Sequence, residues 1–316
     1  MRLKNYGLPY KGSKNTIAED IVAVLPAKKI LVDLFGGGGA ITDYALQCGK
    51  YEKVIYNEID TTIAETFKKA LNGECEDKDR WISRDEFEKI KNVDGYYAVL
   101  YSFGNDCYRY IYSRDKEPIK MAYHHAVVLD DFKPLKKFLG EDIIQRLKNA
   151  VEGIKDTKKR RLVFTKEYGR YLLSLEDTEY NRWLLTTVNT RKKSIRHLLE
   201  HEERGERIRG LKCNSVKNIT IYALDYASVE LPNPNDCVIY CDIPYEGTHK
   251  YKTAKRFDYD RFYRWVEEKA KEGYEIYVSS YDLPTELFTE VWSKTKYTKY
   301  GMRNGKHKIE KLYIPT

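Results

Sequence analysis

The chain contains 316 residues, of which 42% are hydrophobic, so it is long enough to bury a substantial core in one large domain or two smaller ones. Its 56 basic and 48 acidic residues leave a net charge of +8, which permits a polyanionic partner without requiring one. The sequence has no run of about eighteen apolar residues and no apolar N-terminal core, which argues against a membrane span or a signal peptide. We therefore expect a cytoplasmic protein.

Strands and helices alternate at the start of the chain. The apolar residues of 15–25 have helical spacing and stop at Pro26. The elements that follow are a strand at 29–35, four glycines, a helix at 40–49, a strand at 53–60 and a helix at 62–71. This β–α–β–α order predicts a doubly wound, mostly parallel sheet.

The alternation breaks between about 80 and 215, where the sequence predicts long charged helices, for example at 142–154 and 181–203. It resumes with strands at 218–226, 237–245, 274–282 and 308–316, and with a helix at 257–273. We therefore predict one α/β domain formed by 1–78 and 216–316, interrupted by an inserted, mainly helical and basic domain over 79–215.

The six cysteines suggest no metal site. They are Cys48, Cys75, Cys107, Cys213, Cys237 and Cys241, and they contain no CxxC pair and no paired disulfide framework. Cys237 and Cys241 lie four positions apart, but neither a second pair nor a nearby histidine accompanies them. We predict free thiols in a reducing compartment and no bound metal.

The stretch DLFGGGG (33–39) places glycines directly after a buried strand, where a ligand can approach the backbone. Glu58 ends the next strand, where an acid can bind ribose hydroxyls. A dinucleotide fingerprint would need a third glycine, but its position holds Ile41 or Thr42, depending on the frame. A nucleoside-like ligand without a pyrophosphate therefore fits better than NAD.

The strand VIYCD ends in Asp242-Ile243-Pro244-Tyr245. Asp242 can accept hydrogen bonds from an amino group, Pro244 restricts the turn, and Tyr245 offers a flat face to a base. An exocyclic aromatic amine is a poor nucleophile because its lone pair is delocalised. A carboxylate and a backbone carbonyl on its hydrogens would expose that lone pair and stabilise the developing positive charge.

Together these motifs resemble the DNA adenine-N6 methyltransferases of the Dam-like class, which includes many phage and restriction enzymes. The matching segments are PYKGSK (9–14), Asp33-x-Phe35-x-Gly37-x-Gly39, Glu58 in YNEID, Asp225 in YALDY, and Asp242 to Tyr245 at the D-P-P-Y position. The resemblance covers roughly 1–75 and 215–316. It departs from the family at Ile243, where the pattern has its first proline.

The resemblance implies a Rossmann-like S-adenosylmethionine-dependent methyltransferase that acts as a monomer on double-stranded DNA, with the insert as the target-recognition domain. The implied cofactor-binding residues are Tyr10, Lys14, Asp33, Phe35, Gly37, Gly39, Glu58, Asp225 and Asp242. The family flips the target adenine out of the duplex. Asp242 and the carbonyl of Ile243 would then hold N6, while Tyr245 stacks on the base.

The insert gives weaker indications. The segment 102–116 lies where the family carries DNA-reading loops, so Asn105, Tyr108, Arg109 and Tyr112 are candidates for base or phosphate contacts, although an ordinary surface explains them equally well. The basic runs KKRR (158–161) and RKKSIR (191–196) either contact phosphates, through residues such as Lys158, Arg160, Lys192 and Lys193, or form solvated helix faces.

Other functions fit less well. A cytosine-C5 enzyme needs a Pro-Cys nucleophile, which the sequence lacks. Amino-N4 cytosine and protein-glutamine methyltransferases usually begin the tetrad with serine or asparagine, whereas this chain has Asp242. A catalytically silent DNA-binding protein that keeps the fold is the main alternative, and only Ile243 favours it. An NAD-binding oxidoreductase is a distant third.

Overall fold

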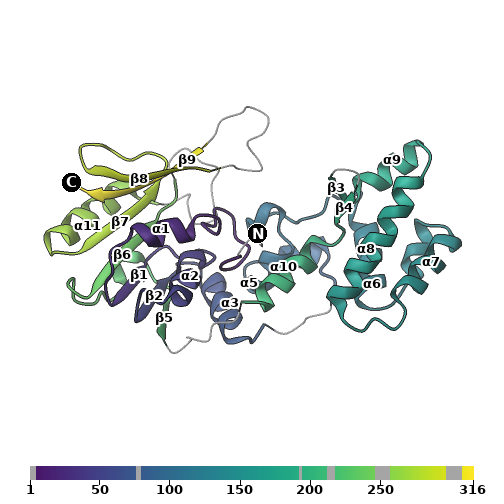
Figure 1. The fold of residues 1–316 in the computed structure, drawn as a ribbon, viewed down its shortest axis with the longest axis horizontal. Coiled ribbons are helices and arrows are strands. Elements are labelled where there is room, and N and C mark those ends of the chain that lie inside the picture. Colours follow the sequence, from purple (N-terminus) through teal and green to yellow (C-terminus); the bar gives the residue numbers. More distant parts are fainter. Residues whose placement is uncertain (1–4, 76–79, 192–193, 212–217, 246–256, 297–307) are drawn as a thin grey trace. The chain divides into compact units, whose positions relative to one another are not determined.

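The computed structural model describes residues 5–75, 80–191, 194–211, 218–245, 257–296 and 308–316 (Figure 1). The chain divides into two compact units. The first unit comprises 1–75, 93–96 and 207–316, and the second comprises 76–92 and 97–206. None of the described helices is long and apolar enough to cross a membrane.

A seven-stranded sheet forms the centre of the first unit, in the order β5-β2-β1-β6-β7-β9-β8. Its strands are β1 (Ile30–Asp33), β2 (Lys53–Asn57), β5 (Ile219–Tyr222), β6 (Cys237–Asp242), β7 (Glu275–Ser280), β8 (Phe288–Lys296) and β9 (Lys308–Pro315). The neighbours from β5 to β7 pair in parallel, whereas β9 runs antiparallel to both β7 and β8.

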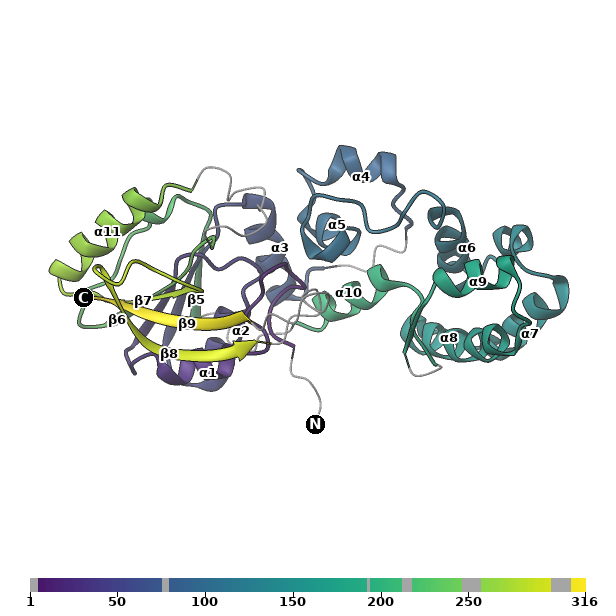
Figure 2. The ribbon, with the colours of Figure 1, turned by 90° about the horizontal axis from the view of Figure 1, so that it is seen from above.

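Helices cover both faces of this sheet. They are α1 (Ala18–Val24), α2 (Ala40–Cys48), α3 (Thr61–Asn72) and α11 (Tyr259–Lys271), and a short 3-10 turn, η4, covers Tyr226–Ser228. Successive strand residues point to opposite faces, so Leu31 joins the core under α1 and α2, and Val32 joins the core under α11. Figures 1 and 2 show α11 on one side of the strands and the α1–α2 pair on the other.

The second unit is mainly helical (Figure 2). Its elements are α4 (Arg84–Ile90), η1 (Phe103–Asn105), α6 (Glu117–Val128), η2 (Lys133–Lys137), α7 (Glu141–Val151), α8 (Thr157–Ser174), α9 (Glu179–Thr186), β3 (Asn189–Arg191) and β4 (Ser194–His197). Two helices, α5 (Gly95–Leu100) and α10 (Glu200–Arg209), contain two of the four points where the chain passes between units. Apolar side chains of α6, α7 and α8 form the core of this unit, with Tyr123 bonded to Tyr168 through their hydroxyls at 2.7 Å.

The elements predicted for the first unit are confirmed, with ends that differ by a few residues. The sequence analysis did not predict β8, the edge strand that pairs only with β9. The helix predicted at 181–203 is wrong, because α9 ends at Thr186 and the antiparallel pair β3–β4 precedes α10. Thr187, Val188 and Thr190 are β-branched, which favours extended backbone over a continuous helix.

Candidate active site

The predicted site residues of the first unit gather at one edge of the sheet. Asp33 ends β1, and Asp242 ends the neighbouring parallel strand β6. Asn57, at the end of β2, donates to the Leu34 carbonyl at 3.0 Å and bonds both backbone polar groups of Leu224 at 3.0 Å. The sequence analysis did not single out Asn57, which joins the segment after β5 to the ends of β1 and β2. Ligands of parallel α/β sheets bind at this carboxyl edge.

The four glycines at 36–39, called the glycine loop below, contact Glu58 through their backbone. Gly37 and Gly39 have φ of 50° and 73°, values that favour glycine. The amide of Gly37 donates to Oε2 of Glu58 at 2.8 Å, and the amide of Asp60 donates to Oε1 at 2.9 Å. Burial raises the pKa of Glu58 to about 7 although these two hydrogen bonds oppose the shift. Each carboxylate oxygen retains a lone pair for a further donor.

Asp33 is fully buried beside this loop, and one of its oxygens accepts from the Thr42 hydroxyl at 2.7 Å. Thr42 occupies a position where a dinucleotide fingerprint would have glycine. The other oxygen of Asp33 is buried without a hydrogen-bond partner among the described residues. Burial raises the pKa of Asp33 to about 7, and the neighbouring acids Asp242 and Glu58 add to the increase while the bond from Thr42 opposes it. Such a group can still gain a donor from a ligand.

Two predicted aromatic residues lie near the glycine loop. The backbone of Leu8, two residues before Tyr10, donates to the Gly38 carbonyl at 2.7 Å, and a Cβ added to Gly37 would lie 3.4 Å from the Tyr10 ring. Phe35 contacts the rings of Tyr226, Phe257 and Phe262, with centroids 5.4, 5.8 and 5.7 Å away. Both predicted aromatic residues, Tyr10 and Phe35, therefore adjoin the loop.

Asp225 has a partner that the sequence did not suggest. Both of its carboxylate oxygens accept from the guanidinium of Arg261, at 2.9 and 2.7 Å, and the amide of Ala227 also donates to it. The hydrogen bonds from Arg261 lower the pKa of Asp225, so it is ionised at neutral pH. A base bound here would share this carboxylate with Arg261.

Lys14 connects the N-terminal segment to the tetrad. Its side chain is buried, and its Nζ lies 2.6 Å from both carboxylate oxygens of Asp242. The same nitrogen lies 3.5 Å from Glu310 and 4.9 Å from the centre of the Tyr245 ring. The cofactor contact of Lys14 stays a prediction; the structure shows that Lys14 pairs with the carboxylate of Asp242.

The sequence analysis missed Glu310. This residue of β9 is 1% exposed, and its carboxylate contacts both Lys14 and the hydroxyl of Tyr245. The sequence KIEKLYIP did contain an indication. Glu310 and Leu312 are two positions apart in a strand and therefore point to the same face, which is buried. An acid on the core side of a strand needs a charged or hydrogen-bonding partner.

Ile243 packs its side chain into the core. It is 2% exposed and belongs to the apolar cluster on the α11 face. The hydroxyl of Tyr259 donates a hydrogen bond to the carbonyl of the next residue, Pro244, at 2.8 Å. This hydrogen bond holds the turn in place. Core contact of Ile243 and this hydrogen bond replace part of the rigidity that a proline would provide.

We expect Ile243→Pro to keep most of the methyl-transfer activity and to lose some stability. The backbone carbonyl remains, whereas removal of a buried side chain costs roughly 1–3 kcal/mol. Steady-state rates and thermal unfolding, measured on the same preparation, check both parts. A loss of activity beyond about tenfold in a folded variant would show that the isoleucine itself matters for the reaction.

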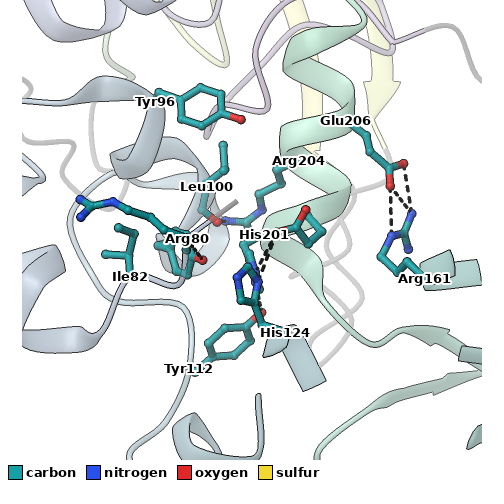
Figure 3. Close-up of polar contacts among 12 residues, drawn as sticks. Arg80, Ile82, Tyr96, Leu100, Tyr112, His124, Arg161, His201, Arg204 and Glu206 are labelled. Atoms are coloured by element: carbon teal, nitrogen blue, oxygen red, sulfur yellow. Dashed lines mark hydrogen bonds and ion pairs between the residues drawn. The ribbon is translucent and has the colours of Figure 1, made fainter. Parts of the chain in front are cut away.

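Two residues of the predicted DNA-contacting set lie inside the second unit. Tyr112 is 6% exposed and bonds His201 through its hydroxyl (Figure 3). Arg160 is 8% exposed, and its guanidinium pairs with Asp130 and donates to the Ala126 carbonyl. Their contact with DNA stays a prediction, and the structure shows that both side chains are largely buried, although Tyr112 also lines the cavity described below.

The other predicted DNA contacts are more accessible. Tyr108 is 58% exposed, and the side chain of Lys158 is 60% exposed. Arg109 pairs with Asp106 at 2.7 Å on the surface, and Asn105 is half-buried in a left-handed conformation with φ of 59°. Lys192 and Lys193 lie outside the described residues.

A cavity of about 1010 Å³ opens in the second unit next to this segment. The basic residues that line it are Arg84, Arg109, Arg114, Lys116 and Lys120, and the acidic residue Glu200 also lines it. Lys120 is buried and donates to the Leu198 carbonyl at 2.6 Å, and burial lowers its pKa to about 8. The concentration of guanidinium and ammonium groups suits a phosphate-bearing ligand.

Comparison with known proteins gives one clear match. The family model described as D12 class N6 adenine-specific DNA methyltransferase matches residues 10–313, nearly the whole chain. Among curated proteins, no sequence matches the chain significantly.

Proposed function

Because the chain belongs to the D12 class N6 adenine-specific DNA methyltransferase family, we propose that it transfers a methyl group from S-adenosylmethionine to N6 of an adenine flipped out of duplex DNA. The observation that carries the proposal is the position of Asp242, which ends β6 beside the glycine loop and is held by Lys14. DNA adenine methylation itself follows from the family.

The residues around the glycine loop fit this cofactor. Glu58 has free lone pairs for ribose hydroxyls, and the buried unpartnered oxygen of Asp33 can accept a further donor. Tyr10 and Phe35 supply apolar surface for the adenosine portion. When bound, S-adenosylmethionine supplies an electrophilic methyl group on a sulfonium sulfur.

Asp242 and the carbonyl of Ile243 would accept the two hydrogens of the adenine amino group. A carboxylate oxygen can accept more than one hydrogen bond, so the ion pair with Lys14 is compatible with a bond from the base to Asp242. These acceptors localise the nitrogen lone pair and stabilise the positive charge that develops on N6. Tyr245, anchored by Glu310, would present its ring to the base.

The binding of S-adenosylmethionine should strengthen as the pH rises through 7. Glu58 has a pKa raised to about 7, and its ionised form accepts ribose hydroxyls more strongly than its neutral form. We expect binding at pH 6 to be about tenfold weaker than at pH 8, measured by titration calorimetry. Glu58→Gln cannot titrate, so its weaker binding should lose the part of this pH dependence that Glu58 contributes. A variant that keeps the full dependence would assign it to another group, such as Asp33, whose pKa is also raised to about 7.

We propose that the second unit is the target-recognition domain. Support comes from its basic cavity and from the exposed side chains of Tyr108 and Lys158. These groups can contact phosphate, which makes affinity depend on salt through counterion release.

Lys158→Ala and Arg109→Ala should each reduce the slope of log affinity against log salt by about one. Lys271→Ala, which removes a 72% exposed lysine of α11 in the first unit, is the control and should leave the slope unchanged. Equal slopes for all three variants and the unaltered protein would show that Lys158 and Arg109 do not contact DNA.

The function is tested by incubating the protein with unmethylated DNA and S-adenosylmethionine labelled in its methyl group, followed by nucleoside analysis. We expect labelled N6-methyladenine as the product. Cofactor binding without product would favour the alternative of a DNA-binding protein that has lost catalysis.

A further inference from the structure

A buried cluster of two imidazoles and a carboxylate lies in the second unit, apart from the site described above. His124 comes from α6, and His201 and Glu202 come from the start of α10; all three are buried. Figure 3 shows the rings of His124 and His201 directed toward each other, with Tyr112 on the far side of His201.

Three donor atoms of the cluster form a nearly regular triangle. Nδ1 of His124 lies 3.1 Å from Nε2 of His201, and Oε1 of Glu202 lies 3.4 Å from the first nitrogen and 3.3 Å from the second. Tetrahedral zinc with nitrogen and oxygen ligands at about 2.0–2.2 Å separates neighbouring donor atoms by roughly 3.3 Å. The triangle therefore has the dimensions of one face of such a site.

Hydrogen bonding alone explains the cluster poorly. The 3.1 Å contact between the imidazoles can hold one proton, and the two contacts of Glu202 are longer than the roughly 2.7–2.9 Å of charge-assisted hydrogen bonds. Either one imidazole donates to the other and a ring lone pair lies beside the Glu202 oxygen, or both imidazoles donate to Glu202 and their N–H groups meet at 3.1 Å. Both arrangements are costly inside a dry core. A cation at the centre satisfies all three atoms.

The surroundings of the cluster hold the ligand atoms in place. The other ring nitrogen of His201, Nδ1, bonds the hydroxyl of Tyr112 at 2.7 Å, and the ring of Tyr101 stacks on His201 at 4.5 Å. An outer hydrogen bond of this kind orients metal-binding histidines and sets their tautomer. Nε2 of His124 has no partner among the described residues, so the polar contacts that orient this ring run through Nδ1.

We propose that His124, His201 and Glu202 bind one Zn²⁺ ion that joins α6 to the start of α10 inside the second unit. Two neutral imidazoles and one carboxylate are a known protein ligand set for zinc. The sequence analysis predicted no metal because it considered the cysteines; the two histidines lie 77 positions apart and gave no local motif. The burial of all three residues indicates a structural ion that enters as the unit folds.

The first test uses the unaltered full-length protein, unfolded with chelator and refolded with or without Zn²⁺. We expect one zinc per chain by elemental analysis and a midpoint of thermal unfolding raised by roughly 5 °C or more when zinc is present. Refolded protein that retains no zinc and shows no shift would overturn the proposal and leave a hydrogen-bonded core.

Variants then locate the ion. Glu202→Gln keeps the shape of the side chain but weakens the oxygen ligand, so zinc affinity should fall at least about tenfold; His201→Ala should abolish binding. His125→Ala is the matched control, because His125 is next to His124 on α6, partly exposed, and paired loosely with Asp131 at 3.6 Å. Zinc binding that survives Glu202→Gln and His201→Ala, or is lost in His125→Ala alone, would contradict this assignment.

Discussion

Replacing Asp242 with alanine should reduce methyl transfer by at least about 10²–10³-fold while cofactor binding falls much less. In the proposed mechanism the carboxylate is the acceptor that stabilises positive charge on N6, so its loss should raise the barrier of the chemical step. Single-turnover rates with labelled S-adenosylmethionine, together with cofactor titration, separate the two effects.

The variant also removes a partner of Lys14, whose nitrogen also lies 3.5 Å from both Glu310 and the Gly12 carbonyl. Thermal unfolding must therefore accompany the rate measurement, and Asp242→Asn provides a second variant of the same shape. Asp236→Ala is the control, because Asp236 precedes the same strand and pairs with Lys29 on the surface. A folded Asp242→Ala protein with near-normal rates would exclude the proposed mechanism.

Replacing Arg161 with alanine should destabilise the protein by roughly 3 kcal/mol. Its side chain is 6% exposed, and its guanidinium pairs with Glu203 at 2.8 Å and with both oxygens of Glu206 at 3.0 and 3.1 Å, as Figure 3 shows for Glu206. Alanine removes the buried guanidinium that both partly buried carboxylates share. We expect the unfolding midpoint to fall by roughly 6–12 °C.

Lys158→Ala is the matched control on the same helix, because its exposed ammonium lies 3.8 Å from Glu206 and contributes little. Its stability should change by about 0.5 kcal/mol or less. Urea unfolding of both variants checks the comparison. Equal stability of the two variants would mean that the network around Arg161 is not a buried ion-pair network in solution.

The parallel strands of the sheet were predictable because each is a short apolar run in the sequence. The apolar runs of β1, β2 and β6 are each followed by a break and then, for the first two, by a helix with periodic apolar residues. The second unit was harder, since its helices carry many charged residues and do not alternate with strands. The wrong helix at 181–203 shows the limit: β-branched residues after Thr186 outweighed a periodicity that continued on both sides of them.

Asp242 to Tyr245, the glycine loop and Glu58 could be proposed as a site from the sequence, because each lies in a short motif whose chemistry depends on neighbouring residues. The burial of individual side chains could not be predicted from short motifs in the same way. Tyr112 and Arg160 belong to basic, aromatic segments that suit DNA, yet both side chains point into the unit that holds them.

What the sequence by itself determined is the order of the strands and helices, the family, and the residues that end β1, β2 and β6. Only the tertiary structure decided which distant side chains meet: Lys14 with Asp242, 228 positions apart, Glu310 with Tyr245, and His124 with His201 and Glu202. The reason is physical. Local patterns depend on bond geometry and on the exposure of one face, whereas pairs of buried charges depend on how whole elements pack, which no short run of residues encodes.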